Sequence, residues 1–272
     1  MAVLQIYFVH RLWFMVHCKE MAYWEKEIRS LFGKAIHRYG LIQDGDRILV
    51  GVSGGKDSLT LLHLLHERRK HVLTHYELIP VHIELGFNPE RANALKEFFE
   101  ARHLSYHIEF THIGLKANSA ENRENPCFLC SWERRKRIFH LAHRLKCNKI
   151  ALGHHKDDII ETLLLNIFYS GEISTMLPLQ SLFKGKIALI RPLALLEEKK
   201  IERFAREMDL PVGPSGCPSS GKTKRGEVKE LIEALGKKNR RVKGNIFRSL
   251  SNVKMEYTLT PICHSRGKGD PA

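Results

Sequence analysis

The chain has 272 residues, of which 43% are hydrophobic and 27% are charged. This ordinary globular composition excludes a disordered chain, and the length allows one large domain or a domain with a smaller appendage. Lys and Arg number 44 against 30 Asp and Glu, which gives a formal net charge of +14. Such an excess of positive charge favours a polyanionic partner, and nucleic acid is the leading candidate.

The N-terminal segment is apolar, but it is not expected to be a membrane-spanning helix or a secretory signal peptide. His10, Arg11 and His17 interrupt it, so no apolar run reaches the roughly 18 residues of a spanning helix. It also lacks the early basic residues and the small-residue cleavage site of a signal peptide. We therefore expect a cytoplasmic protein that does not contact membranes. Met21 is the expected natural start, and the alternative is an amphipathic helix over Val3 to Val16.

From Arg47 onward, short apolar runs alternate with longer segments of helical period, which is typical of strand and helix units around a parallel sheet. The expected strands are residues 48–52, 78–83, 105–110, 150–153 and 187–190. The expected helices begin after Ser58, at Asn88-Pro89, near Trp132, near Asp157 and at Glu197. Residues 114–125 are predicted to form a loop that leads into the next segment.

These elements predict an α/β fold with a doubly wound, parallel, five-stranded sheet in the order 3-2-1-4-5. A turn-rich segment follows at residues 211–218, and two further helices are expected to form a small helical C-terminal extension.

A glycine-rich segment lies where the first predicted strand ends and a helix begins. Residues 51–58 read Gly-Val-Ser-Gly-Gly-Lys-Asp-Ser, so backbone N–H groups and the helix N-terminus can receive a phosphate. The segment is not a Walker A loop, because Asp57 separates Lys56 from Ser58. A second polar segment, residues 153–158, follows the fourth predicted strand. The predicted strand order brings both segments to the same edge of the sheet, where ligands bind in such folds.

Six cysteines are too few for a disulfide scaffold, so their spacing points to metal or redox chemistry. Cys127 and Cys130 are separated by two residues, which allows both thiolates to bind one metal. Cys217 is the obvious third ligand, and a zinc site would need Cys147 or a histidine as a fourth. The alternative is that the pair is simply buried. The cysteines expected to be bystanders are Cys18, Cys147 and Cys263.

Residues 53–58 resemble the PP-loop of the ATP pyrophosphatases, which split ATP between its α and β phosphates and transfer AMP to a carbonyl oxygen. With residues 153–162, the cysteine pair and Cys217, the chain is similar to the tRNA 2-thiocytidine synthetase family over about residues 44–253. The resemblance implies an adenine nucleotide alpha hydrolase-like fold, and a 4Fe-4S cluster on three cysteines that holds sulfide. Gly216-Cys217-Pro218 departs from this family and resembles related thiolases, so the modified tRNA position stays open.

The candidate catalytic residues are Lys56, Asp57 and Asp158. Lys56 and the loop amides would hold pyrophosphate, and Asp57, Asp157 and Asp158 could organise Mg²⁺. Helix capping is the alternative role for the last two. The resemblance places adenine near His82 and Ile83. The predicted ATP-binding set is Ser53, Gly54, Gly55, Lys56, Asp57, Ser58, His82, Ile83, Gly153, His154 and Asp157, and the predicted metal ligands are Cys127, Cys130 and Cys217.

The predicted organisation has four parts. An N-terminal extension with a helix spans residues 1–43, and a PP-loop nucleotide-binding domain that carries the Cys-x-x-Cys loop spans 44–212. A third-cysteine loop with a basic helical extension spans 213–258, and a frayed tail spans 259–272.

Two basic clusters flank the predicted site. Arg134 to Arg137 follow the cysteine pair, and no acidic residue lies between Lys237 and Arg248. The first cluster could simply be a solvated helix face. The second cluster is stronger evidence, because a cationic helix without acidic residues repels itself unless phosphate is its partner. The predicted RNA-binding residues are Arg134, Arg135, Lys237, Lys238, Arg240, Arg241 and Lys243.

The sequence thus predicts an ATP-dependent thiolase that acts on a tRNA cytidine and uses ATP, Mg²⁺ and a 4Fe-4S cluster. The sulfur donor, a cysteine desulfurase or free sulfide, stays open, as does a homodimer. One alternative is a PP-loop uridine thiolase or another PP-loop ligase; lysidine synthesis and amide formation do not need the three cysteines. The other alternative is a non-catalytic, metal-containing RNA-binding protein, which would not need Lys56 or Asp57.

Overall fold

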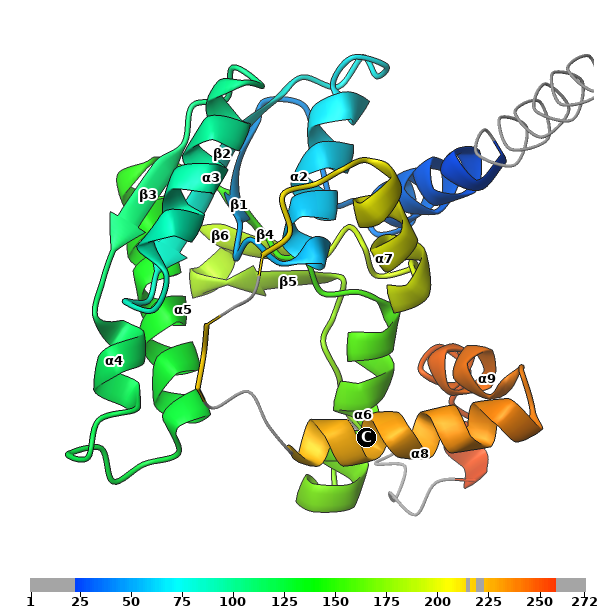
Figure 1. Cartoon of the computed structure of the whole chain (residues 1–272). Helices are drawn as coiled ribbons and strands as arrows, with labels where there is room; N and C mark the ends of the chain where they lie inside the picture. Colours follow the sequence, from blue (N-terminus) through cyan, green and yellow to red (C-terminus); the bar gives the residue numbers. More distant parts are fainter. Residues whose placement is uncertain (1–22, 214–215, 219–222, 258–272) are drawn as a thin grey trace, which may run out of the picture.

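The computed structural model describes residues 23–213, 216–218 and 223–257. Its six-stranded sheet has the order β3-β2-β1-β4-β6-β5 (Figure 1). Strand β5 pairs antiparallel with β6, and the remaining pairs are parallel. The strands are β1 (Asp46–Gly51), β2 (Tyr76–Glu84), β3 (His107–Phe110), β4 (Lys149–Ala151), β5 (Leu179–Leu182) and β6 (Ile187–Ile190).

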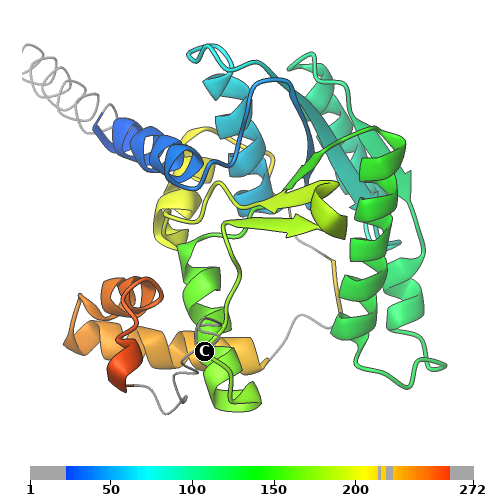
Figure 2. The same cartoon turned by 180° about the vertical axis from the view of Figure 1, so that it is seen from behind.

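Helices cover both faces of the sheet, which forces the central strands to be apolar on both sides (Figure 2). In β1, Ile48 and Val50 pack in one core and Leu49 packs in the other. The first core contains residues of the helix over 23–38, of α2 (Lys56–Arg68), of α3 (Pro89–Glu100) and of α7 (Glu198–Glu207). The second core is closed by Leu141 and Ala142 of α5 (Pro126–Arg144).

The doubly wound order predicted from the sequence is confirmed, with the predicted fifth strand as β6. The five-strand prediction missed β5, which lies at the edge of the sheet. Its sequence, Leu-Gln-Ser-Leu, is short and has no β-branched residue, so it lacked the signal used for the other strands. The prediction of a frayed tail and of a start at Met21 or a helix over 3–16 concerns residues outside those described.

The cysteine pair lies in a helix and not in a loop, which corrects the predicted organisation. Residues 114–117 of the expected loop belong to α4 (Ile113–Ala117), and the helix expected from Trp132 begins six residues earlier, at Pro126. Asn125 caps α5, because its side-chain oxygen accepts hydrogen bonds from the backbone N–H of Cys127 and Phe128 at 3.0 and 3.2 Å. The same Asn-Pro signal starts α3, so this boundary was readable from the sequence.

The predicted helical C-terminal extension is present as α8 (Lys224–Lys238) and α9 (Val242–Ser249). Both pack on α6 (Lys156–Ser170) through a small apolar cluster around Ile160, Val228 and Ile232 (Figure 1). The expectation of a single cationic helix over residues 237–248 was wrong, because Asn239 takes an extended conformation that ends α8. No helix in the described part of the chain is long and apolar enough to cross a bilayer.

A buried ion pair joins β1 and β4 at the end of the strands opposite the glycine-rich segment. Asp46 and Lys149 are 3% and 7% exposed, and their Oδ2 and Nζ atoms lie 2.6 Å apart. Lys149 also donates to the Leu41 carbonyl, and Asp46 accepts from Gln43 N and Asn148 Nδ2. These hydrogen bonds and the attraction between the two charges offset the free energy of removing them from water. Either charge buried without the other would be strongly destabilising.

We expect Lys149→Ala to lower the free energy of unfolding by about 3 to 5 kcal/mol, because it leaves the Asp46 carboxylate buried without its countercharge. Urea unfolding followed by circular dichroism measures this. Lys136→Ala, on an exposed position of α5, is the matched control and should change stability by less than about 0.5 kcal/mol. Equal unfolding midpoints for the two variants would contradict the assignment.

Candidate functional site

The glycine-rich segment forms a tight turn between β1 and α2. Gly54 has a φ of +78°, and a Cβ there would lie 2.3 Å from Nε of Arg91, so only glycine fits. The turn is closed by Ser58, whose hydroxyl accepts from Ser53 N at 3.1 Å and donates to the Gly55 carbonyl at 3.0 Å. Lys56 is the first residue of α2, so it lies at a helix N-terminus as well as on the loop. This arrangement suits an anion.

The two predicted motifs meet, as the strand order required. Strand β4 pairs with β1, and a Cβ on Gly153 would lie 3.0 Å from the backbone of Asp57 and Ser58. The segment after β4 therefore presses directly on the first turn of α2. The structure thus brings Lys56, Asp57, Gly153, Asp157 and Asp158 together at one edge of the sheet.

His82 and Ile83, the predicted adenine neighbours, point to opposite faces of the sheet. The His82 ring lies within 2.8 Å of the Val52 carbonyl through Nδ1, next to the glycine-rich turn. Burial lowers the pKa of His82, so the ring is neutral at pH 7. Ile83 packs in the core beneath α5. A contact between adenine and Ile83 can therefore use only the main chain.

A buried histidine organises the carboxylates around the turn. His155 caps α6, and its Nε2 lies 3.3 Å from Oδ2 of Asp158 and 3.8 Å from Oδ1 of Asp57. Burial raises the pKa of the Asp57 carboxyl, although Lys56 and His155 oppose the shift. Its Oδ1 atom is buried and has no hydrogen-bond partner. Burial also lowers the pKa of His154 to about 4, so that ring is neutral near pH 7.

The helical extension supplies cations to this site, which the sequence did not predict. Arg225 Nη1 lies 3.2 Å from Asp158 Oδ1 and 3.1 Å from Glu161 Oε2, and Lys243 Nζ lies 2.5 Å from Asp157 Oδ1. Lys243 was predicted to bind RNA, but in this structure it pairs with an acid of the predicted ATP site. The missed residues are Arg91, Glu161, Glu198, Arg225 and Lys229, whose partners are distant in sequence.

The three predicted metal ligands are neighbours. Cys127 is exposed, and Cys130 and Cys217 are half-buried. Burial raises the pKa of the Cys130 thiol; Arg134 opposes the shift, and Cys217 and Cys127 add to it. The segment 216–218 lies beside the start of α5 in both cartoon views (Figures 1 and 2). Within the described residues no three His, Cys, Asp or Glu side chains are arranged to hold a metal ion, so the thiols are close but not in ligating positions.

Arg91 connects the thiol segment to the glycine-rich turn. Its guanidinium lies against Gly54, and its Nη2 donates to the Gly213 carbonyl at 2.8 Å. Phe87, just before α3, lies between Gly114 and Gly216. The loop that carries Cys217 is thus fixed to the same edge of the sheet as the turn.

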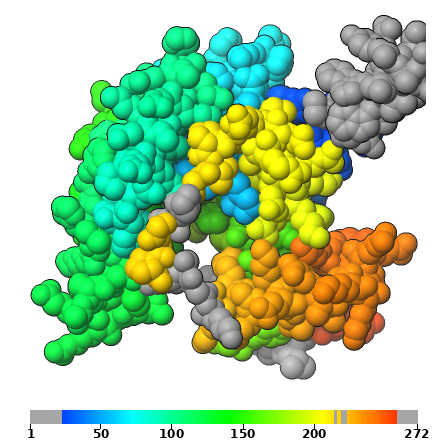
Figure 3. All heavy atoms as spheres, viewed as in Figure 1, coloured from blue at the N-terminus to red at the C-terminus, as the bar shows by residue number. Residues whose placement is uncertain are grey.

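Apart from Lys243, the predicted RNA-binding residues lie on two exposed surfaces. Arg134 and Arg135 are exposed on α5, beside the exposed aromatic rings of Phe128 and Trp132, which sequence reasoning did not single out. The other surface contains Lys237, Lys238, Arg240 and Arg241, at the end of α8 and in the turn that follows. Figure 3 shows a hollow between the side of the molecule with α4 and α5 and the C-terminal helices.

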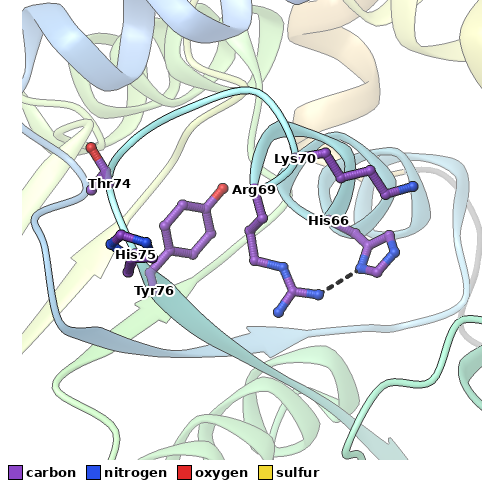
Figure 4. Close-up of a pocket in the computed structure, with 6 residues that line it drawn as sticks. All are labelled: His66, Arg69, Lys70, Thr74, His75 and Tyr76. Carbon is purple, nitrogen blue, oxygen red and sulfur yellow. Dashed lines mark hydrogen bonds between the residues drawn. The ribbon is translucent and has the colours of Figure 1, made fainter.

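A separate cavity of about 290 Å³ lies at the other end of the sheet, where α2 ends and β2 begins (Figure 4). It is lined by His66, Arg69, Lys70, Thr74, His75 and Tyr76. None of the predicted site residues lines it. Because ligands of doubly wound folds bind at the carboxyl ends of the strands, this cavity is not the candidate site.

Comparisons with known proteins agree with this geometry. The family description "PP-loop domain" matches residues 23–212. The tRNA-cytidine(32) 2-sulfurtransferase of Geobacter sulfurreducens is 40% identical over 237 residues, covering 86% of this chain and 92% of the relative. The protein of that name from Geotalea daltonii is 40% identical over 238 residues, covering 86% and 94%.

A solved structure is similar as well. It is described as the U34-tRNA thiolase NcsA from Methanococcus maripaludis with its [4Fe-4S] cluster, and its sequence is 26% identical to this chain. The TM-score is 0.70, and the alignment covers 84% of this chain and 78% of the other. The family predicted from residues 53–58 and 153–162 is confirmed: the chain belongs to the PP-loop family, among the tRNA-cytidine 2-sulfurtransferases.

Proposed function

We propose that the protein is a cytoplasmic, ATP-dependent tRNA thiolase that replaces the C2 oxygen of a cytidine with sulfur. The observation that carries this proposal is the position of Arg91, which lies against Gly54 of the PP-loop (residues 51–58) and donates to the carbonyl of Gly213, four residues before Cys217. It fixes a phosphate-binding turn and three neighbouring thiols at the same edge of one sheet. The names of the relatives support tRNA as the substrate and cytidine as the base.

The PP-loop would hold the phosphates of ATP while AMP is transferred to the cytidine oxygen and pyrophosphate leaves. Burial lowers the pKa of the Lys56 ammonium, but Asp57 and Glu198 outweigh this and raise it. Lys56 is therefore a cation at any physiological pH. Fixed next to the helix N-terminus, it would stabilise the negative charge that develops on the departing pyrophosphate.

Mg²⁺ fits this site at Asp57. The Oδ1 of this residue is buried and accepts no hydrogen bond, although Lys56 Nζ lies 3.6 Å away, and it is the kind of hard oxygen ligand that Mg²⁺ prefers. Asp158 lies close by but shares its carboxylate with Arg225 and His155. Asp157 is engaged on both oxygens, by Lys243 and by the backbone N–H of Glu198. Because both oxygens of Asp158 and both oxygens of Asp157 already have partners, we assign the cation to Asp57 first.

The thiols of Cys127, Cys130 and Cys217 fit an iron–sulfur cluster by their chemistry and their proximity. A 4Fe-4S cluster held by three thiolates leaves one iron open and would supply the sulfide. Burial raises the pKa of the Cys130 thiol, and Arg134 opposes this shift and so favours the thiolate that such a ligand must become. The 4Fe-4S cluster of the similar U34-tRNA thiolase supports this assignment.

Phosphates of tRNA would bind the exposed cations of α5 and of the segment after α8. The exposed rings of Phe128 and Trp132 lie on the same helix as the cysteine pair, so they are suited to stack on a base brought out of the tRNA. Zinc in place of iron would instead favour a non-catalytic RNA-binding protein.

Lys56→Ala should abolish the cleavage of ATP to AMP and pyrophosphate, because the transition state loses a fixed cation worth about 3 kcal/mol or more. Lys56 also contacts Glu198 and Asp57, but these pairs are partly exposed, so the melting temperature should change little. Product analysis and thermal unfolding measure the two effects. A stability loss comparable to that of Lys149→Ala would argue against a role confined to the site.

Anaerobic purification should give a brown protein with broad absorption in the visible blue, as expected for a protein that holds a 4Fe-4S cluster. Cys127→Ala, Cys130→Ala and Cys217→Ala should each remove the absorption, and Cys147→Ala, whose thiol is buried beside α5, should not. Metal analysis completes the test. Stoichiometric zinc without iron would overturn the cluster assignment.

Replacing Lys238, Arg240 and Arg241 together by Gln should weaken tRNA binding and flatten its salt dependence. Each lost phosphate contact removes about 0.7 to 0.9 from the slope of log affinity against log salt, so roughly two units disappear if all three residues touch phosphate. Filter binding at several salt concentrations measures the slope. The control, Lys26, Lys96 and Arg206 to Gln, removes equal charge from exposed helices elsewhere. An unchanged slope in the first variant would move the RNA surface to Arg134 and Arg135.

A further inference from the structure

Two lysines from distant parts of the chain converge on one carboxylate beside the PP-loop. Oε1 of Glu198 lies 3.1 Å from Nζ of Lys56, and its Oε2 lies 2.7 Å from Nζ of Lys229. Lys56 begins α2, Glu198 begins α7, and Lys229 lies on α8. Because like charges repel, two ammonium groups are held this close only when an anion lies between them.

The carboxylate between them is fully charged. Burial works to raise the pKa of Glu198, but its hydrogen bonds to Lys229 and Lys56 bring it down to about 2. All three side chains are nevertheless reachable from solvent: 28% of the Lys56 side chain is exposed, 23% of Glu198 and 44% of Lys229. A dissolved anion can therefore reach the place where the two ammonium groups meet.

Lys229 is held in this position by its own helix. Arg225, one turn earlier on α8, pairs with Asp158 and Glu161 and donates to the hydroxyl of Thr162 at 3.1 Å. On the same face of α8, Val228 and Ile232 are buried against α6. The backbone at Lys229 is thus anchored by charge and by packing, and the ammonium does not depend on Glu198 alone for its direction.

We propose that Lys229 is a second phosphate-binding lysine of the ATP site, supplied by the C-terminal extension, and that Glu198 holds the position of a phosphate oxygen between Lys229 and Lys56. This inference rests on the proposed ATP site and adds a residue that no part of the PP-loop motif contains. Because Lys56 binds phosphate at the PP-loop, Lys229 would contact the pyrophosphate portion of ATP and not the AMP portion.

A competing role is purely structural: Lys229 could tie α8 to α7 through Glu198 and never meet a ligand. The two roles differ in what the charge at this position controls. A structural tie affects thermal stability and treats every nucleotide alike. A phosphate-binding lysine separates ATP and pyrophosphate from AMP, because only the first two carry the phosphates that it touches.

The test compares Lys229→Gln with the unmodified full-length protein in titrations with ATP, inorganic pyrophosphate and AMP by isothermal calorimetry. We expect about fivefold to tenfold weaker binding of ATP and pyrophosphate, the effect of losing one charge-assisted hydrogen bond at a partly exposed site, and unchanged binding of AMP. Lys229→Arg, which keeps the charge, should restore most of the affinity.

Lys224→Gln is the matched control, because Lys224 is exposed on the same helix and lies over the ring of Tyr169. It loses the same charge and should bind all three ligands as the unmodified protein does. Unchanged or tighter ATP binding by Lys229→Gln, or equal weakening for ATP and AMP, would overturn the proposal. Lys56→Gln distinguishes a failure of the proposed ATP site from a failure of the role given to Lys229. If Lys56→Gln leaves ATP binding intact, the ATP site itself is misassigned. If Lys56→Gln weakens ATP binding and Lys229→Gln does not, only the role of Lys229 is wrong.

Discussion

The parallel pairing of β1 with β4 is the constraint on which the rest of the site depends. It makes two segments about a hundred residues apart end at the same edge of the sheet, so that Gly153 presses on the backbone of Asp57 and Ser58. At the opposite end of the same two strands, the buried pair of Asp46 and Lys149 fixes their register. A shift of either strand would separate the lysine of the PP-loop from the acids that follow β4.

Charge balance around the PP-loop is supplied by the C-terminal helices. Asp157, Asp158 and Glu161 lie on α6, and their countercharges come from Lys243 and Arg225. Helices α8 and α9 thus contribute to the proposed nucleotide site as well as to the proposed RNA surface, with cations that face the acids of α6 and exposed cations at the end of α8. The proposed ATP site and the proposed RNA surface therefore draw on different cations of the same small helical unit.

The thiol site depends on a different contact. Cys127 and Cys130 share the first turn of α5, where Asn125 holds the helix start, and only tertiary contacts bring Cys217 to them. Arg91 provides one such contact through the Gly213 carbonyl, while its guanidinium closes over Gly54. The same arginine thus contacts both the glycine-rich turn and the chain four residues before the third thiol.

By itself, the sequence determined the parallel order of the strands, the position of the PP-loop, and its meeting with residues 153–158, because periodicity and turn chemistry are local properties. It could not determine β5, whose four residues lack β-branched side chains, or the break at Asn239, which a run of like charge concealed. Nor could it pair Lys243 with Asp157 or bring Lys229 and Glu198 to Lys56, because such contacts join residues far apart in the chain. Only the packing of α8 and α9 against α6 decided them, through the burial of Ile160, Val228 and Ile232.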